Sequence, residues 1–371
     1  MYLFKYYRPD FFFDKAIRYN ELYFSSTEQL NDPNDLKTSY FFEDEIYLWQ
    51  RLLESELIAG VRELQDVLDL TNRSLAKELC RIFLGTPMDG SIEQLEYTFS
   101  KYDEDIVASL GRHLKSSESI ENTQFKDLRE SRSELITLCK NGIRDRVLKG
   151  IRAGVYSVSF STSALEPMMW AHYAAGFKGC VVIYNALNNV IHLTRNIYSK
   201  DSKEYFPFNV DNVEYEDYEK HIPILQSALG GDKSIRNTLV VKNKFWKYEA
   251  EKRIFHTRAY VATHVWKLTF LLSKDYSDRI FHHDPSLIAG IIFGPGFSDE
   301  KKESIEFLLR DNRRHSPCEP FYLFDTELTS KGAIQIVRGK EVESSFQTGN
   351  TGEISRKELT AVLSKLGILN S

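Results

Sequence analysis

Two hydrophobic patterns divide this chain. Short apolar runs typical of β-strands occupy its first 25 residues and return after Gly154. Between them, from Glu43 to about Gly150, apolar residues recur at helical spacing, as at Leu48, Leu52 and Leu53. The runs that predict strands are residues 2–7, 21–25, 155–160, 180–184, 213–215, 268–272, 288–293, 321–324 and 333–337.

Helical segments also occur among the strands, and the whole pattern predicts an α+β protein. The helices expected outside the central block are residues 10–19, a short segment after Pro167, most of 218–241, 300–309 and 355–366. We predict a mixed core from residues 1–40 and 151–315, a helical insertion or lid at 41–150, and C-terminal strands with a helix at 316–371.

Composition places the chain among ordinary globular proteins. Hydrophobic residues make up 42% and charged residues 27% of the 371 residues. The formal net charge of −5 argues against a surface that coats a polyanion, although a local basic patch is compatible with it. With 24 Phe and 20 Tyr, many aromatic residues must belong to the core, so no single one is informative.

The cysteines and the N-terminus favour a reduced, cytoplasmic protein. Cys80, Cys139, Cys180 and Cys318 are scattered and form no C-x-x-C pair, which predicts neither a disulfide framework nor a structural zinc site. The first residues are interrupted by charge and show no cleavage site of a signal peptide. No apolar run approaches the roughly 20 residues that span a bilayer, so no membrane partner is expected.

The segment 249–253, EAEKR, is the most informative chemical pattern. As a strand it would place Glu249, Glu251 and Arg253 on one face, with successive neighbours about 6 to 7 Å apart. Burying two carboxylates and a guanidinium costs free energy, so their burial would indicate a functional role. The pattern fits a catalytic site, and it also fits a solvated edge strand with an internal ion pair.

Hydroxyl and aromatic groups around residue 160 form a second pattern. Ser159 and Ser161 stand at the end of a predicted strand, where they can bind a ribose or phosphate, or satisfy backbone groups in a turn. Trp170, His172 and Tyr173 follow on the next helix and could form a pocket wall or belong to the core. The turn at residues 31–35 contains Asn31 and Asp32, which are turn-forming residues as well as candidate catalytic ones.

Several enzyme classes lack their motifs in this sequence. There is no G-x-S-x-G, no P-loop and no G-x-G-x-x-G. His, Cys and Asp residues show no spacing of the H-E-x-x-H kind, so no metal site is predicted.

Six segments, taken in their order along the chain, resemble a bacterial family known as domain of unknown function 2971. They are LFKY at 3–6, LYFS at 22–25, LNDP at 30–33, MWAHYA at 169–174 with Gly179, WKYEAEKR at 246–253, and IFGP at 292–295. The resemblance leaves out the helical block and the C-terminal tail, and the family name implies no activity.

A more distant resemblance is to ADP-ribosyltransferases. These enzymes place a His or Arg on an early strand, Ser-Thr-Ser or a tyrosine on a middle strand, and a Glu, often as Glu-x-Glu, on a late strand. This chain has Lys5, Tyr6 or Arg8 early, a Ser-Thr-Ser at 161–163, and Glu249 and Glu251 late. It has no early histidine, and its helical block exceeds the minimal transferase core. The resemblance implies a mixed, mainly antiparallel β core.

The same resemblance implies residue roles in the cleavage of NAD, which would be the substrate, with no metal required. Glu251 would stabilise the oxocarbenium-like transition state, and Glu249 would orient or deprotonate the acceptor. The binding residues implied are Tyr6, Arg8, Ser159, Ser161, Trp170, His172, Tyr173 and Arg253.

Three functional hypotheses follow from the sequence. The first is an NAD-dependent ADP-ribosyltransferase or NAD glycohydrolase, acting as a bacterial toxin or phage-defence effector on a protein, a nucleic acid or water. The second is a non-enzymatic binding protein, in which the aromatic helix and the turn at 31–35 form a recognition surface. The third is a metal-dependent nuclease or other hydrolase that uses Asp32, His172 and Glu251.

Overall fold

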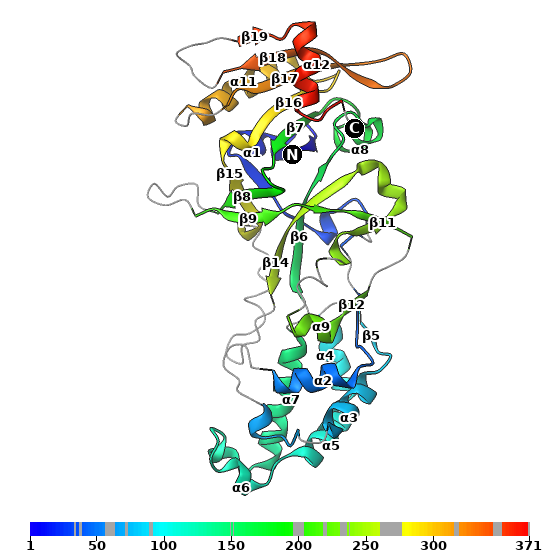
Figure 1. Cartoon of the computed structure of the whole chain (residues 1–371), viewed down its shortest axis with the longest axis vertical. Coiled ribbons are helices and arrows are strands. Elements are labelled where there is room, and N and C mark those ends of the chain that lie inside the picture. The colour runs from blue at the N-terminus through cyan, green and yellow to red at the C-terminus, as the bar shows by residue number, and fades with distance from the viewer. Residues whose placement is uncertain are drawn as a thin grey trace.

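The chain forms a large β-sheet part and a helical body (Figure 1). Helix α7 (Arg132–Leu148) of the helical body leads into strand β6 (Arg152–Ser161), and β6 pairs with β14 (Glu251–Ala259). The helical body lies beyond the ends of these two strands. The computed structural model describes residues 1–32, 35–36, 39–55, 64–70, 73–88, 92–148, 150, 152–195, 204–217, 221–230, 236, 238–259, 277–314, 319–343 and 351–369.

The main sheet has ten strands and is mainly antiparallel. Its order is β10-β14-β6-β1-β7-β16-β17-β18-β19, with β3 pairing beside β6, and only the β16–β17 pair among these described strands is parallel. The remaining strands are β1 (Tyr2–Tyr7), β3 (Ser25–Ser26), β7 (Cys180–Asn185), β10 (Asp211–Asn212), β16 (Ile288–Phe293), β17 (Phe321–Leu328), β18 (Ile334–Val342) and β19 (Thr351–Glu353).

Helices cover both faces of this sheet, which explains why β7 is apolar from Cys180 to Tyr184. Val182 faces a core that α1 (Phe11–Arg18) and α11 (Asp299–Arg313) complete, whereas its neighbour Val181 faces the core under α8 (Pro167–Tyr173) and α12 (Arg356–Lys365). Side chains alternate between the faces of a strand, so an all-apolar run indicates burial on both sides.

The helical body has a hydrophobic core of its own. Trp49 and Phe83 stack at its centre with ring centroids 5.3 Å apart. Tyr40 and Ile222 also belong to this core, so segments before and long after the central block contribute to it. Its further elements are α2 (Ile46–Glu54), α3 (Ser74–Phe83), α4 (Ile92–Lys101), α5 (Asp103–His113), α6 (Ser117–Ile120), α9 (Ile224–Ala228) and the small sheet β12 (His221–Pro223), β4 (Ser39–Phe41) and β5 (Pro87–Met88).

Two smaller sheets flank the main one. The first has the order β2 (Glu21–Tyr23), β15 (Ile280–His283), β8 (Val190–Thr194) and β9 (Phe206–Asn209). The second is the parallel pair β11 (Glu214–Glu216) and β13 (Val241–Asn243). Along the chain, β13 is followed directly by the 3₁₀ helix η4 (Lys244–Glu249), which precedes β14. The remaining 3₁₀ helices are η1 (Thr27–Gln29), η2 (Leu64–Asp66), η3 (Lys126–Leu128), η6 (Ser277–Arg279) and η7 (Pro285–Leu287).

The α+β class expected from the sequence is confirmed, including the mainly antiparallel sheet. The helical segment predicted over most of 218–241 is confirmed in part: α9 and the described residues 236, 238 and 239 are helical, whereas 221–223 form β12 and β13 begins at Val241. The strand predicted at 268–272 lies outside the described residues.

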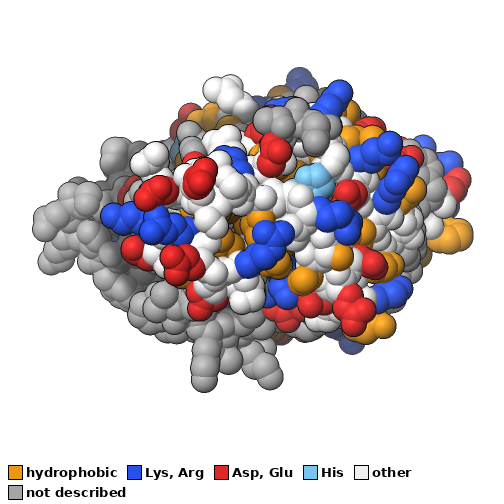
Figure 2. Space-filling view, turned by 90° about the horizontal axis from the view of Figure 1, so that it is seen from below, with side chains coloured by type: hydrophobic (Ala, Val, Ile, Leu, Met, Phe, Trp, Pro, Cys, Tyr) orange, Lys and Arg blue, Asp and Glu red, His pale blue; other side chains and the backbone are white. Residues whose placement is uncertain are grey.

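Surface and membrane properties can be stated for the described part of the chain. None of its helices combines the length and the apolar character that crossing a bilayer requires. Seen from the helical end, Lys and Arg side chains are interspersed with Asp and Glu (Figure 2). Cys80, Cys139 and Cys180 are buried free thiols.

Candidate functional site

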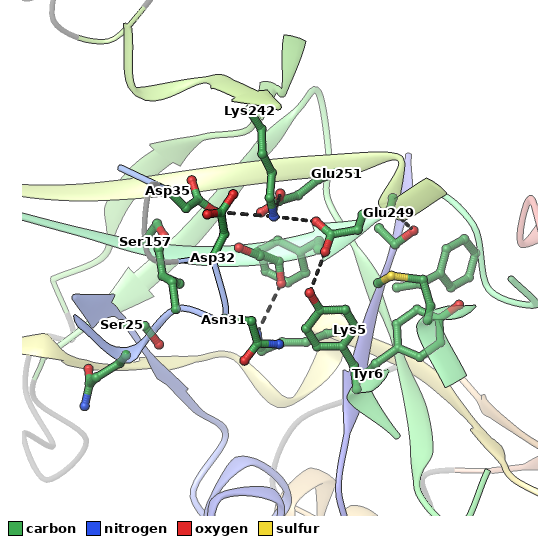
Figure 3. A pocket seen from close by; sticks show the side chains of 18 of the residues that line it. Lys5, Tyr6, Ser25, Asn31, Asp32, Asp35, Ser157, Lys242, Glu249 and Glu251 are labelled. Carbon is green, nitrogen blue, oxygen red and sulfur yellow. Dashed lines mark hydrogen bonds and ion pairs between the residues drawn. The ribbon is translucent and has the colours of Figure 1, made fainter. Parts of the chain in front are cut away.

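A cavity of about 330 Å³ opens where β1, β6 and the start of β14 meet (Figure 3). The three strands are neighbours in the sheet, with Phe4 opposite Ser161 and Ser161 opposite Glu251. The cavity therefore collects residues from an early, a middle and a late part of the chain. It is lined by Phe4, Lys5, Tyr6, Arg8, Ser25, Gln29, Leu30, Asn31, Asp32, Asp35, Ser157, Ser159, Phe160, Ser161, Met169, Tyr173, Lys242, Glu249 and Glu251.

The two glutamates of the EAEKR segment reach the cavity from different elements. Glu249 ends the helix η4, and β14 begins only at Glu251. Between them Ala250 adopts a left-handed conformation with φ of 45°, which an alanine rarely takes. The sequence-based expectation of Glu249 on the strand face is therefore wrong, whereas Glu251 and Arg253 share that face.

A buried cluster of charges surrounds Glu251. Arg253 forms two hydrogen bonds to the Glu251 carboxylate, at 2.6 and 2.8 Å, and two to Asp35, at 2.7 and 2.6 Å. Lys242 Nζ lies 2.5 Å from Glu249 Oε2, 3.1 Å from Glu251 Oε2 and 3.3 Å from Asp35 Oδ2. Figure 3 shows Lys242 pointing between these carboxylates. Three acids face two cations, which leaves one excess negative charge when all are ionised.

The two glutamates differ in their proton affinity. Burial by itself would raise the pKa of Glu251, but Arg253 and Lys242 outweigh it and lower that pKa to about 2. For Glu249 burial prevails, and its pKa is raised despite the opposing effect of Lys242. Glu251 is thus a fixed anion at neutral pH, and Glu249 is the more readily protonated of the pair.

Tyr173 connects the helix α8 to Glu249. Its hydroxyl donates to Glu249 Oε1 at 2.5 Å. Burial and the nearby Glu249 charge raise the pKa of Tyr173, so its hydroxyl keeps its proton. Pro167 starts α8 and the Glu166 side chain accepts from the backbone N–H of Met168, so the short helix holds Tyr173 in place.

The serines of β6 have distinct roles. The Ser161 hydroxyl donates to the backbone oxygen of Glu249 at 2.7 Å and accepts from Ser163 N–H, so it fixes the turn that carries Glu249. Ser159 hydrogen-bonds to Glu251 and contributes to lowering the pKa of that carboxyl. Ser157 lies further along the same face, and its buried hydroxyl has no hydrogen-bond partner among the described residues.

Strand β1 supplies the third side of the cavity. Tyr6 donates its hydroxyl to Ser163 O at 2.9 Å, and Arg8 is exposed, with one N–H donating to His172 O at 3.3 Å. Lys5 Nζ donates to Ser159 O at 3.2 Å. Burial lowers the pKa of Lys5 to about 8, against the opposing effect of Glu251.

The structure brings together seven of the ten residues predicted for the site. Tyr6, Arg8, Ser159, Ser161, Tyr173, Glu249 and Glu251 line the cavity.

The other three predicted binding residues lie outside the lining. Trp170 is fully buried, donates its indole N–H to Ala164 O and packs edge-on against Tyr6 with centroids 5.7 Å apart. His172 is exposed and contacts the Tyr248 hydroxyl at 3.1 Å. Arg253 is fully buried behind Glu251. Trp170 and Arg253 thus support lining residues.

Sequence reasoning missed Lys242 and Asp35 as site residues. Lys242 directly follows the apolar run at 239–241, which is the one local signal that it is buried with a partner. Asp35 belongs to the turn predicted at residues 31–35. The trio Asp32, His172 and Glu251 of the hydrolase hypothesis is not assembled, because His172 lies outside the cavity. In the part of the chain that the structure describes, no group of three or more His, Cys, Asp or Glu side chains is arranged to hold a metal ion.

Comparison with known proteins bears on one stretch of the chain. Residues 169–254 match the model of a family described as a protein of unknown function, DUF2971. This match confirms the resemblance to that family, and it contains Tyr173, Lys242, Glu249 and Glu251. No curated protein and no solved structure matches the chain.

Proposed function

We propose that the protein is an NAD-consuming enzyme of the ADP-ribosyltransferase kind. One observation carries the proposal: Glu251, an anion at neutral pH, lies in a cavity wall beside the serines of β6 and across from Tyr6 of β1. These are the late, middle and early strand positions that the resemblance to ADP-ribosyltransferases requires. Their adjacency in one sheet supports the proposal, because residues far apart in the sequence face one cavity.

Cleavage of NAD requires stabilisation of a developing cation. When the bond between the ribose C1′ and the nicotinamide nitrogen breaks, its electron pair leaves with nicotinamide, and positive charge forms on the ribose. The Glu251 carboxylate would stabilise that cation. Arg253 and Lys242 hold the carboxylate still, so little reorganisation is needed during the reaction.

Glu249 and Tyr173 would handle the acceptor. After the cation forms, an acceptor lone pair bonds to C1′, and the acceptor loses a proton. Glu249 is the suitable base, since burial raises its pKa above that of Glu251. The Tyr173 hydroxyl, 2.5 Å from Glu249 Oε1, would orient it.

Other lining residues would hold NAD in place. The rings of Tyr6 and Tyr173 offer aromatic surfaces for nicotinamide. Arg8 offers a guanidinium for the diphosphate, and its exposure places it at the mouth of the cavity. Ser157 offers a buried hydroxyl for a polar group of the substrate.

The proposal is tested by incubating the full chain with NAD, with and without a chelator, and measuring nicotinamide by chromatography and NAD binding by calorimetry. We expect binding heat and nicotinamide production that the chelator does not change. A binding protein would produce neither. A metal-dependent hydrolase would lose its activity with the chelator.

A further inference from the structure

A second cavity of about 360 Å³ adjoins the proposed NAD cavity. Six residues line both, so the two cavities share a wall: Lys5, Tyr6, Arg8, Ser25, Gln29 and Tyr173. The second cavity extends from there to α1 and β2, through Tyr7, Asp10, Phe12, Ala16, Glu21 and Tyr23.

Tyr173 lies at the junction of the two cavities. It lines both, and its hydroxyl donates to Glu249, which lines only the first. A molecule in the second cavity would therefore lie beside Tyr173, the hydrogen-bond partner of the proposed base. This is the position that an acceptor needs.

The outer wall of the second cavity is aromatic and exposed. Helix α1 buries Phe13, Ala16 and Ile17, which leaves Phe11 66% and Phe12 60% exposed at its first turn. Phe12 lies 6.1 Å from Phe11 and 6.3 Å from Tyr23, measured between ring centroids. Adjoining exposed rings beside a polar cavity are typical of a surface on which bases stack.

Cations border this aromatic surface. Arg8 is exposed, and Lys301 Nζ donates to Pro9 O at 3.4 Å. Asp10 accepts from two N–H groups at the start of α1, and Glu21 lies 3.9 Å from Lys15. Aromatic rings flanked by such cations fit the bases and the phosphates of a single strand.

We infer that the second cavity binds the acceptor, and that the acceptor is a base of single-stranded nucleic acid. This inference rests on the proposed function. The base stacks on Phe12 and Tyr23, and its phosphates lie toward Lys301. A nitrogen or oxygen lone pair of the base bonds to C1′ as nicotinamide leaves, and the proton of the base passes to Glu249.

The test measures the binding of fluorescein-labelled single-stranded DNA and RNA 12-mers to the full chain by anisotropy. Phe12→Ala should raise Kd about tenfold, the loss expected for one base–aromatic stack. Phe12→Trp should retain wild-type affinity. Tyr97→Ala, which removes an equally exposed ring 63% accessible in the helical body, should change nothing. Annealing the complementary strand should weaken binding, because paired bases cannot stack on the protein.

Transfer is then measured with NAD present, by the mass of the oligonucleotide. We expect the wild type to add one ADP-ribose to a 12-mer. Equal affinity of Phe12→Ala and wild type, or modification of added protein with no modification of any 12-mer, would overturn the inference. Nicotinamide production separates it from the proposed function: a wild type that produces none refutes that function, while the Phe12 comparison still decides whether this surface binds single strands.

Discussion

The Nζ atom of Lys242 lies 3.1 Å from Oε2 of Glu251, and both side chains are buried. The lysine comes from β13 and the glutamate from the first position of β14. The contact therefore ties the proposed catalytic carboxylate to a neighbouring sheet. The predictions below follow from this contact and from the residues around it.

Replacing Glu251 should destabilise the fold as well as remove catalysis. Glu251→Gln removes the negative charge with which Arg253 and Lys242 pair, while both cations stay buried. Removing one partner of a buried ion pair costs about 3 to 5 kcal/mol. Urea unfolding of Glu251→Gln and of the exposed control Glu300→Gln measures the difference, and equal stability of the two would contradict the buried network.

The same carboxyl should affect acid stability. Its pKa is about 2 in the folded chain and near 4.5 when unfolded, so the unfolded state binds the proton more readily. Glu251 thus stabilises the fold above pH 4.5, and this contribution is lost as the pH falls from 4.5 toward 2. The free energy of unfolding should fall over this range more steeply in the wild type than in Glu251→Gln. Parallel curves would mean that Glu251 is not ion-paired.

Lys242 should matter far more than its neighbour Lys244. Lys242→Met leaves Asp35, Glu249 and Glu251 without the cation they share, and the pKa of Glu249 should rise further. Nicotinamide release should fall, and its acid limb should move to higher pH. Lys244→Met is the matched control, because Lys244 is exposed and pairs only with Asp217 among the described residues. If both variants behave alike, the cluster does not set the activity.

Tyr173→Phe tests the proposed base. The variant loses the hydroxyl that donates to Glu249, a bond that lowers the pKa of that carboxyl. The pH–rate profile should shift upward on its acid side, and kcat should drop by about 10²-fold, the usual scale for general base catalysis. The fold should survive, because only a hydroxyl is removed. An unchanged profile would show that Tyr173 does not act on Glu249.

Ser157→Ala should reduce binding without reducing stability. The Ser157 hydroxyl is buried with no partner in the described structure, so its removal costs the folded chain no hydrogen bond. The KM for NAD should rise several-fold. Ser227→Ala is a close control, since Ser227 is also buried with an unpartnered hydroxyl but belongs to α9 in the helical body. A KM that changes equally in both variants, or in neither, would exclude Ser157 from the substrate site.

The sequence predicts the elements of the core better than their assembly. The all-apolar run at 180–184 correctly indicates a strand buried on both faces. The strand order cannot be deduced in the same way, because it depends on contacts between residues far apart in the chain. The sequence pattern therefore predicts residues 316–371 as a unit of their own. In the structure, β17 and β18 of this segment extend the main sheet through the parallel pairing of β16 with β17.

The candidate site is predictable where its residues form a motif. Glu251 and Tyr6 stand in segments that carry the resemblance to DUF2971, and Ser161 belongs to the Ser-Thr-Ser at 161–163. Lys242 belongs to no motif, and its role depends on the pairing of β11 with β13. Glu249 lies off the strand because Ala250 adopts a left-handed conformation. An alanine in a sequence does not predict that conformation.

The proposed role of Glu251 is to stabilise the cation that forms when the bond between nicotinamide and ribose breaks. The most direct measurement is the initial rate of nicotinamide release from NAD by the wild type, Glu251→Gln and Glu300→Gln, at pH 7 and at a temperature where circular dichroism shows all three folded. If Glu251 has this role, the wild type and Glu300→Gln release nicotinamide, and Glu251→Gln releases it at a rate at least about 10²-fold lower than the wild type. Release by Glu251→Gln at the wild-type rate, or no release by the wild type, would contradict it.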